Sequence, residues 1–463
     1  MQKTLKENKM GTMPVGKLLF SMSIPMMLSM LVQAMYNVVD GVYIANYSKD
    51  ALAALTYAFP MQNLLIGSAT GLAVGLNAIL SKSLGEKDSG RVNRSAANAL
   101  FLAGTVYVFF LFVGLFLARP FIAMQTKTEA VIDAGTDYLR IICCCSAFLN
   151  VQILFERMMQ STGRTIYTLF TQGIGAVINI ILDPFFIYEK GDTVFGMKLG
   201  FGFGLGAKGA AIATVIGMAV AAVLAVLFNT IKNKDVRVSF KGFRPDGETI
   251  KRTLSVGVPS IIMVGVGSVM TSGMNMILSY RFSDLAASVF GVYFKLQSFV
   301  FMPTFGLNNG SIPIIAYNWG AQKRERMLSC VRIATFSIVV YMLFGFAMMQ
   351  LFPEAMLTLF DADAEMMTMG TAALRTISFA FIAAGLCVGF IGLFQALGKG
   401  VFAMLVSMCR QLVILLPCAF LFSLTGNVNA VWWAFPLAEI VSALMCVIFF
   451  FKVKREIIDK IPS

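Results

Sequence analysis

The chain has 463 residues, of which 58% are hydrophobic and only 13% are charged. A soluble protein of this length needs far more charge to cover its surface, so the composition excludes that class and indicates a polytopic membrane protein. The net charge of +13 could suggest nucleic acid binding. The basic residues are distributed as a membrane topology requires, however, so we expect the lipid bilayer as a partner and no nucleic acid.

Segments without Asp, Glu, Lys or Arg recur along the chain, and each can cross about 30 Å of hydrocarbon as a helix. The first covers 18–39, and later ones cover 51–81, 95–118, 209–231, 253–280, 333–353, 376–398 and 411–438. They predict an all-α polytopic membrane protein with twelve transmembrane helices. We place these helices at 18–44, 51–80, 95–118, 136–160, 166–188, 207–230, 254–280, 285–316, 331–352, 367–397, 401–424 and 430–451.

The basic residues favour one side of this arrangement. With the N-terminus inside, and with residues up to three positions inside a helix end included, the cytoplasmic segments hold 26 Lys and Arg residues and the external segments hold seven. The positive-inside rule then predicts a multi-pass protein of the cytoplasmic (plasma) membrane with both termini in the cytoplasm. The expected cytoplasmic segments are the N-terminal segment 1–17, a basic linker at 231–252 and the C-terminal tail 452–463.

The two halves of the sequence partly match each other at an offset of about 235 residues. FSMSIP (20–25) aligns with LSVGVP (254–259), TDYLRI (136–141) with TAALRT (371–376), and QSTGR (160–164) with QALGK (395–399). Repeated matches at one offset indicate an internal repeat. Six helices in each half give a parallel repeat, so we predict an N-lobe at 18–230 and a C-lobe at 253–451, related by a pseudo-two-fold axis along the membrane normal.

Polar residues of the N-lobe converge near the outer side of the membrane. Asp40 follows 22 uncharged residues, and a carboxylate in hydrocarbon costs about 2.5–3.5 kcal/mol even on lenient scales, which favours a functional role. At 1.5 Å per residue, Asp183 and Thr214 fall at a similar height. Asn179 precedes Asp183 by one turn and shares its helix face.

Two carboxylates in a dry site should not both be ionised. Such a pair can exchange a proton, or it can bind a small hard cation such as Na⁺, with Asn179 and Thr214 completing the oxygen shell. The alternative is that Asp40 only caps or bridges helices near the interface. We therefore predict an ion-coupling site at Asp40, Asn179, Asp183 and Thr214, with H⁺ preferred over Na⁺.

Four segments carry a family resemblance: IPMMLSMLVQAMYNVVDGVYIANYSKDALAAL, SKSLGEKD, QSTGR and GAKGAAIATVIG. Together, in this order, they resemble the multidrug and toxic compound extrusion (MATE) family over essentially the whole chain. The resemblance is strongest to the DinF-like branch, where acids and an amide on helices 1 and 5 carry ion coupling. It implies those roles for Asp40, Asn179 and Asp183. Helices 7 and 10 lack the acids of the NorM-like branch, which argues against a NorM-type sodium site.

Three charged residues fall near mid-depth in the C-lobe: Lys295, Arg410 and Glu439. One interpretation is a charge network that satisfies itself, because isolated charges there are costly. The other is a second coupling or gating site.

A substrate cavity has no single signature in this sequence. Thirty methionines and 41 phenylalanines suit a deformable apolar pocket, since Met repacks easily and aromatic rings attract cations. The candidates for cavity contacts are Tyr36, Asn37, Gln62, Met270, Asn275, Gln297 and Asn309. The sequence contains no histidine, and its eight cysteines have no metal-ligand spacing, so we expect no cofactor and no metal beyond possible Na⁺ at the coupling site.

The sequence thus favours a monomeric antiporter that exports small amphipathic, often cationic, organic substrates in exchange for H⁺ or Na⁺. A flippase for a lipid-linked oligosaccharide, or for another lipid, is the alternative with related architecture. An intramembrane enzyme is disfavoured, because the longest loop is the basic linker and offers no catalytic domain.

Overall fold

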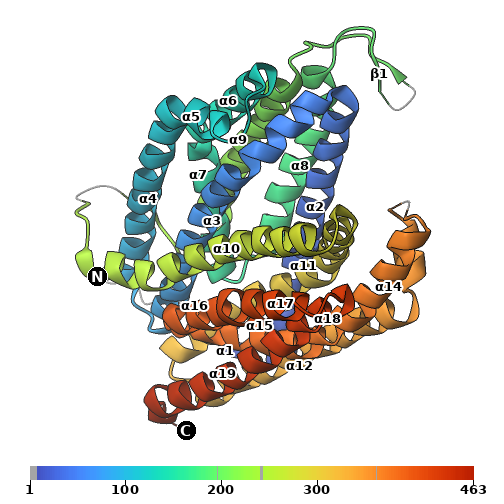
Figure 1. The fold of residues 1–463 in the computed structure, drawn as a ribbon. Coiled ribbons are helices and arrows are strands. Elements are labelled where there is room, and N and C mark those ends of the chain that lie inside the picture. Colours follow the sequence, from blue (N-terminus) through green and yellow to red (C-terminus); the bar gives the residue numbers. More distant parts are fainter. Residues whose placement is uncertain (1–7, 195–196, 240–242, 361, 463) are drawn as a thin grey trace. The chain divides into compact units, whose positions relative to one another are not determined.

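The computed structural model describes residues 8–194, 197–239, 243–360 and 362–462. Its secondary structure is helical apart from one short hairpin, as Figure 1 shows. In the described residues, ten helices are long and apolar enough to cross a membrane, and twelve spans result when each of two bent helix pairs counts as one. The chain is therefore an all-α polytopic membrane protein.

The chain forms two compact units. In its described part, the first unit comprises 28–261, and the second comprises 8–27 with 262–462. The boundaries at 28 and 262 fall inside helices, in α2 (Val15–Tyr47) and α10 (Gly247–Arg281). Each of these helices therefore begins in one unit and ends in the other. The predicted lobes, 18–230 and 253–451, follow the sequence repeat instead of these compact units.

In its described part, the first unit contains seven further α-helices, one π-helical segment and a hairpin. Its elements are α3 (Lys49–Gly85), α4 (Ser89–Phe112), the π-helical segment η1 (Val113–Leu117), α5 (Ala118–Ala123), α6 (Glu129–Cys144), α7 (Ser146–Ser161), α8 (Ile166–Ile187), β1 (Thr193–Val194), β2 (Met197–Lys198) and α9 (Gly206–Lys232). Its core packs apolar side chains of α2, α3, α6, α8 and α9 together.

The second unit begins with the short helix α1 (Lys9–Thr12) and the first part of α2. After α10 it contains α11 (Asp284–Gly320), α12 (Arg324–Leu351), α13 (Pro353–Thr358), α14 (Ala364–Ser378), α15 (Ala380–Ala396), α16 (Gly400–Met408), the π-helical segment η2 (Cys409–Leu415), α17 (Leu416–Ser423), α18 (Val428–Trp432), α19 (Ala434–Glu456) and the 3₁₀ turn η3 (Ile458–Lys460). Phe290, Phe381 and Trp432 are among its fully buried side chains.

Two predicted helices are bent in the structure at matching places of the repeat. The span predicted at 136–160 bends by 45° between α6 and α7, at Cys145, and the span predicted at 367–397 bends by 45° between α14 and α15, at Phe379. These residues lie 234 positions apart. Hydrophobic periodicity continues through both bends, which is why the sequence predicted unbroken helices.

The repeat also appears in the tight turns between helices. Lys87 and Gln322, 235 residues apart, both have left-handed backbones with φ of 57° and 58°. Gly163 and Gly398, at the same offset, have φ of 81° and 72°, where glycine avoids the Cβ clash. Equivalent turns therefore have equivalent backbones, and the predicted internal repeat is confirmed.

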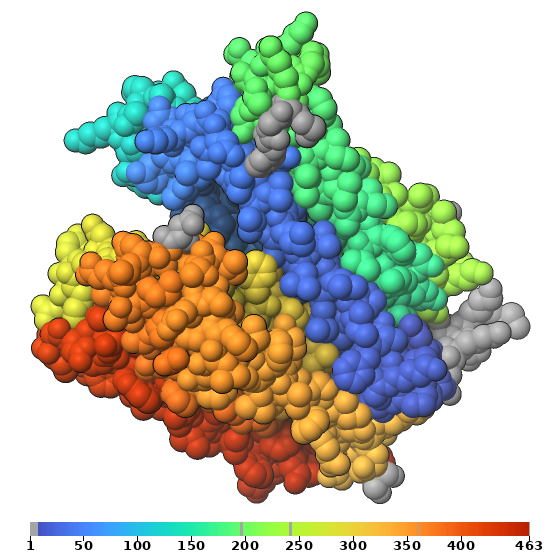
Figure 2. Space-filling model, turned by 90° about the vertical axis from the view of Figure 1, so that its right-hand side faces the viewer, coloured from blue at the N-terminus to red at the C-terminus, as the bar shows by residue number. Residues whose placement is uncertain are grey.

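A hairpin projects from the first unit beyond the helices, and it is visible near the top of Figure 2. Thr193 of β1 pairs with Lys198 of β2 in antiparallel register, and an isolated bridge joins Glu189 to Phe203. The segment lies between the helices predicted at 166–188 and 207–230. It connects α8 to α9 and so allows these two helices to pack against each other.

Candidate functional site

Three of the four predicted coupling residues meet between α8 and α9. The side-chain amide of Asn179 donates to Asp183 Oδ1 over 3.2 Å and to Thr214 Oγ1 over 3.3 Å. Asp183 is fully buried, and Asn179 and Thr214 are nearly so. The i,i+4 spacing of Asn179 and Asp183 places both on one face of α8, as the sequence predicted.

Glycines bring the two helices close enough for these contacts. A Cβ on Gly175 of α8 would lie 3.0 Å from the Gly217 carbonyl oxygen, and a Cβ on Gly217 of α9 would lie 2.7 Å from the Gly175 carbonyl oxygen. Near the other end of α8, Gly209 packs directly against the backbone of Phe186. This antiparallel register places Thr214 opposite Asn179.

Gly217→Ala should therefore disturb the site without touching its polar atoms. The added methyl would force α8 and α9 apart at Gly175, and overpacking of this kind costs about 1–3 kcal/mol. We expect a lower thermal unfolding temperature and weaker coupling to the ion gradient. Gly173→Ala is the matched control, because nothing lies within 4 Å of its added Cβ. Equal effects of the two substitutions would contradict this role for the close approach.

Asp40 is brought towards this cluster by contacts at the outer ends of α2 and α8. Tyr188, just after α8, donates from its hydroxyl to the backbone carbonyl of Tyr43 over 2.7 Å. Its ring also packs edge-on against that of Tyr47, with the centroids 5.7 Å apart. These contacts set a parallel register in which Asp40 lies beside Asp183, within electrostatic range.

The decisive feature of the cluster is a set of buried oxygens without donors. Within the described part of the chain, Asp40 Oδ1, Asp183 Oδ2 and Asn179 Oδ1 are buried and accept no hydrogen bond. Burying a polar atom unpaired costs free energy, and burying an unpaired charge costs far more. A proton on one carboxylate, or a small cation bound to these oxygens, would remove that cost.

A second buried carboxylate in the same unit differs, because it accepts hydrogen bonds on both of its oxygens. Glu156 of α7 is 2% exposed, and it accepts from Thr171 and Gln152 on one oxygen and from Gln172 on the other. The sequence analysis did not identify Glu156, although its position inside a predicted span was a signal. Its three donors stabilise both oxygens of the carboxylate, whereas Asp183 accepts only from Asn179 on one oxygen, and Asp183 Oδ2 and Asp40 Oδ1 accept no hydrogen bond.

Two tyrosines complete the surroundings of the acids. Tyr138 of α6, which the sequence analysis missed, is buried and donates to Gln62 Oε1 over 3.3 Å. It lies within electrostatic range of Asp40 and Asp183, as does Tyr36. Gln62 and Tyr36, which are predicted cavity residues, thus lie close to the groups around the carboxylates, and their role in a cavity stays a prediction.

In the second unit, two of the three predicted charges form an ion pair. Arg410, in the π-helical segment η2, lies 3.3 Å from Glu439 of α19, and both side chains are largely buried. Lys295 is exposed, and its ammonium lies 5.8 Å from the centre of the Phe360 ring. It forms no ion pair with Arg410 or Glu439 within the described residues. The predicted three-residue network is therefore a pair in this structure.

The other predicted cavity residues have varied surroundings. Met270 packs against the core of the second unit. Asn37 and Asn275 are exposed, and Gln297 and Asn309 are half-buried. They stay candidates for substrate contacts. Among the described residues, no three Cys, Asp or Glu side chains gather in a metal-binding arrangement.

Comparison with known proteins places this geometry in a family. The MatE family model matches twice, over residues 25–185 and 259–421. The two matches begin at Pro25 and Pro259, which lie at the offset of the repeat. The chain belongs to the MATE family. Its assignment to the DinF-like branch stays a prediction.

Curated relatives and solved structures agree with this assignment. The multidrug export protein MepA of Staphylococcus aureus (strain bovine RF122 / ET3-1) is 25% identical over 436 residues, covering 93% of this chain and 92% of the relative. MepA of Staphylococcus haemolyticus (strain JCSC1435) is 22% identical and covers 96% of each chain. A MATE structure described as the straight conformation superimposes with a TM-score of 0.89 at 22% identity, covering 98% of this chain and 99% of that one. An outward-facing MATE transporter of the MOP superfamily gives 0.88 at 22% identity, with the same coverage.

Proposed function

We propose that this MATE-family protein is a secondary active antiporter. It exports amphipathic, often cationic, organic compounds in exchange for H⁺ or Na⁺. The observation that carries the proposal is the set of buried oxygens of Asp40, Asn179 and Asp183 that lack donors. The names of the relatives, which are multidrug export proteins, support the substrate class.

The proposed cycle uses the carboxylates as the point of coupling. When the site is open to the outside, a proton binds to Asp40 or Asp183, and the lobe can then close around a neutral site. Release of the ion on the inside restores a charge that is costly in a dry site, and this favours the conformation that takes up substrate. Alternating access of two six-helix lobes moves the substrate outward.

The hydrogen bonds at Asn179 favour H⁺ over Na⁺ as the coupling ion. The amide nitrogen already bonds to Asp183 Oδ1 and Thr214 Oγ1, so these two oxygens are held in place without a cation. A proton on one carboxylate makes that group a donor to a neighbouring oxygen and removes one of the two charges. Na⁺ instead needs several oxygens around it.

A lipid or lipid-linked oligosaccharide flippase is the second candidate. We place it lower because such a carrier needs a cationic central cavity for its phosphate. The charged side chains of the proposed coupling site are acidic, and they suit a proton or a cation.

We propose that the protein is a monomer in the plasma membrane with both termini in the cytoplasm. Cysteine labelling tests this topology in a background without native cysteines. An impermeant reagent added outside should label a cysteine at Lys190 and should not label one at Arg244, both of which are exposed positions. Labelling of Arg244→Cys from outside would reverse the proposed orientation.

Transport itself is tested with inverted membrane vesicles. Ethidium should accumulate when a proton gradient is imposed, acidic inside, in the absence of sodium. A sodium gradient at uniform pH should give little accumulation. Accumulation with neither gradient, or transport of a lipid-linked substrate in place of ethidium, would contradict the proposal.

A further inference from the structure

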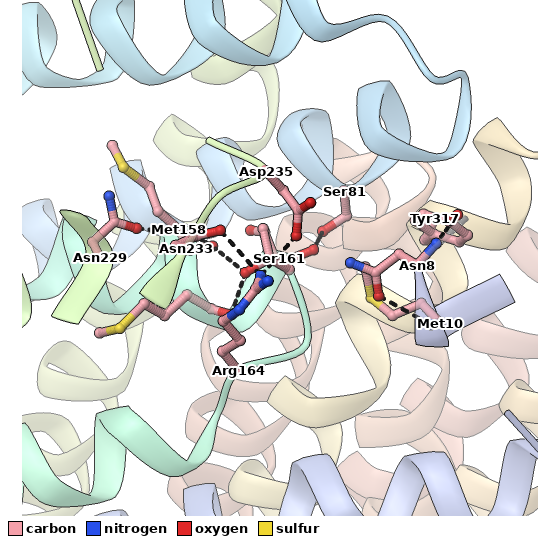
Figure 3. Close-up of polar contacts among 12 residues, drawn as sticks. Asn8, Met10, Ser81, Met158, Ser161, Arg164, Asn229, Asn233, Asp235 and Tyr317 are labelled. Carbon is pink, nitrogen blue, oxygen red and sulfur yellow. Dashed lines mark hydrogen bonds and ion pairs between the residues drawn. The ribbon is translucent and has the colours of Figure 1, made fainter. Parts of the chain in front are cut away.

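The segment that connects the two halves of the chain is held against the first unit at its beginning. Arg164 lies 2.7 Å from Asp235 and donates to Asn233 over 3.1 Å. Asn233 in turn donates to the Met158 carbonyl oxygen. Figure 3 shows Arg164 directed at both linker residues. Asp235, the first acidic residue of the linker, is therefore already paired with Arg164.

Two asparagines of α4 fix the segment further along. The backbone N–H of Arg237 donates to Asn93 Oδ1, and that of Asp246 donates to Asn98 Oδ1, both over 2.9 Å. The linker therefore follows the first turns of α4 instead of extending into solvent. The next two acids are also engaged: Asp246 accepts from the hydroxyl of Thr249 and Glu248 accepts from Arg252.

Three other basic residues of the linker have no acidic partner within the described part of the chain. Lys234, Arg237 and Arg244 are exposed, and none of them forms an ion pair within the described residues. Arg94 of α4 is also exposed and lies within electrostatic range of Asp246. An uncompensated positive surface thus borders the start of a membrane-spanning helix.

An aromatic side chain extends from this basic surface to the depth of the membrane. The ring of Phe243 lies 6.0 Å from that of Phe101, which is 42% exposed on α4. Arg94 is the last charge before the apolar run 95–118, so Phe101 lies about 9 Å beyond the start of that run. Phe243 is therefore at the level of acyl chains, whereas Arg237, whose N–H bonds to Asn93, lies near the level of Arg94 and the headgroups.

We propose that Lys234, Arg237, Phe243 and Arg244 bind an anionic phospholipid of the adjoining leaflet, which the positive-inside rule makes the cytoplasmic one. Lys234, Arg237 and Arg244 contact the headgroup phosphate, and Phe243 packs among the acyl chains. Only a lipid offers a phosphate and an apolar chain at these two depths. Anionic headgroups attract basic residues beside membrane helices in the same way.

Lipid binding to the purified full-length protein tests the proposal. Native mass spectrometry in detergent, with phosphatidylglycerol or phosphatidylcholine titrated in, should show preferential retention of phosphatidylglycerol. Removing one basic residue should weaken binding roughly fivefold, and the triple variant K234Q/R237Q/R244Q should bind roughly a hundredfold more weakly. Phe243→Ser should weaken retention of the long-chain lipid further.

The matched control is K127Q/K190Q/K198Q, which removes three exposed, unpaired basic residues from the opposite end of the same unit. It should retain wild-type lipid binding. All six substitutions are at exposed positions, so both variants should fold, and K234R/R237K/R244K should retain binding as a check. Equal weakening by the control, equal binding of both lipids, or competition by millimolar inorganic phosphate would overturn the proposal.

Discussion

Asp40→Asn is expected to abolish gradient-driven efflux while expression and folding stay close to normal. The asparagine has the shape of a protonated aspartate but cannot release a proton, so the site would be held in one charge state. Asp183→Asn should act in the same way, because the two carboxylates lie within electrostatic range. Ethidium uptake into inverted vesicles, compared with thermal unfolding of the same variants, separates loss of coupling from loss of folding.

Glu156→Gln provides a comparison for these variants. Glu156 is also buried, but its carboxylate accepts three hydrogen bonds. The substitution should therefore lower the stability of the protein more than it affects coupling. Substrate binding should partly survive in Asp40→Asn, because coupling and substrate sites communicate through the conformation. Efflux by Asp40→Asn at the wild-type rate under a proton gradient would contradict the mechanism and direct attention to Glu439.

Glu439→Gln is expected to destabilise the second unit. The substitution leaves Arg410 buried without its partner, and breaking a buried pair typically costs about 3–5 kcal/mol. Neutralising both residues, as in Arg410→Met with Glu439→Gln, should restore much of the lost stability. Thermal unfolding in the same detergent measures both effects.

Glu456→Gln is the matched control, because its ion pair with Lys399 is much more exposed than the Arg410–Glu439 pair, and ion pairs in contact with solvent contribute little. It should leave the unfolding temperature nearly unchanged. Intact stability of Glu439→Gln together with lost transport would instead support a gating role for the Arg410–Glu439 pair.

Much of this arrangement could be predicted because membrane helices obey simple constraints. Apolar length located the spans, and the 3.6-residue period placed Asn179 beside Asp183. Helix direction and rise per residue then placed Thr214 at the same height. These predictions do not require knowing which helices are neighbours. They assume only that buried polar groups of different helices lie close enough to form hydrogen bonds.

Other features depend on tertiary contacts that one sequence does not encode locally. Tyr138 lies beside the carboxylates because α6 bends at Cys145 and packs on α3, where Gln62 accepts its hydrogen bond. Lys295 has the depth expected for a partner of Glu439, but depth does not determine which side of α11 it occupies. Hydrophobic periodicity likewise does not predict that α2 and α10 are each divided between the two units.

The most direct test of the central claim is substrate affinity of the purified protein as a function of pH and of Na⁺. Because linkage is reciprocal, an ion that drives export by binding at Asp40 and Asp183 must weaken substrate binding when it is bound. Ethidium Kd should therefore rise as pH falls in the wild type, and it should be independent of pH in the Asp40→Asn/Asp183→Asn double variant. The same pH dependence in both proteins would contradict the account.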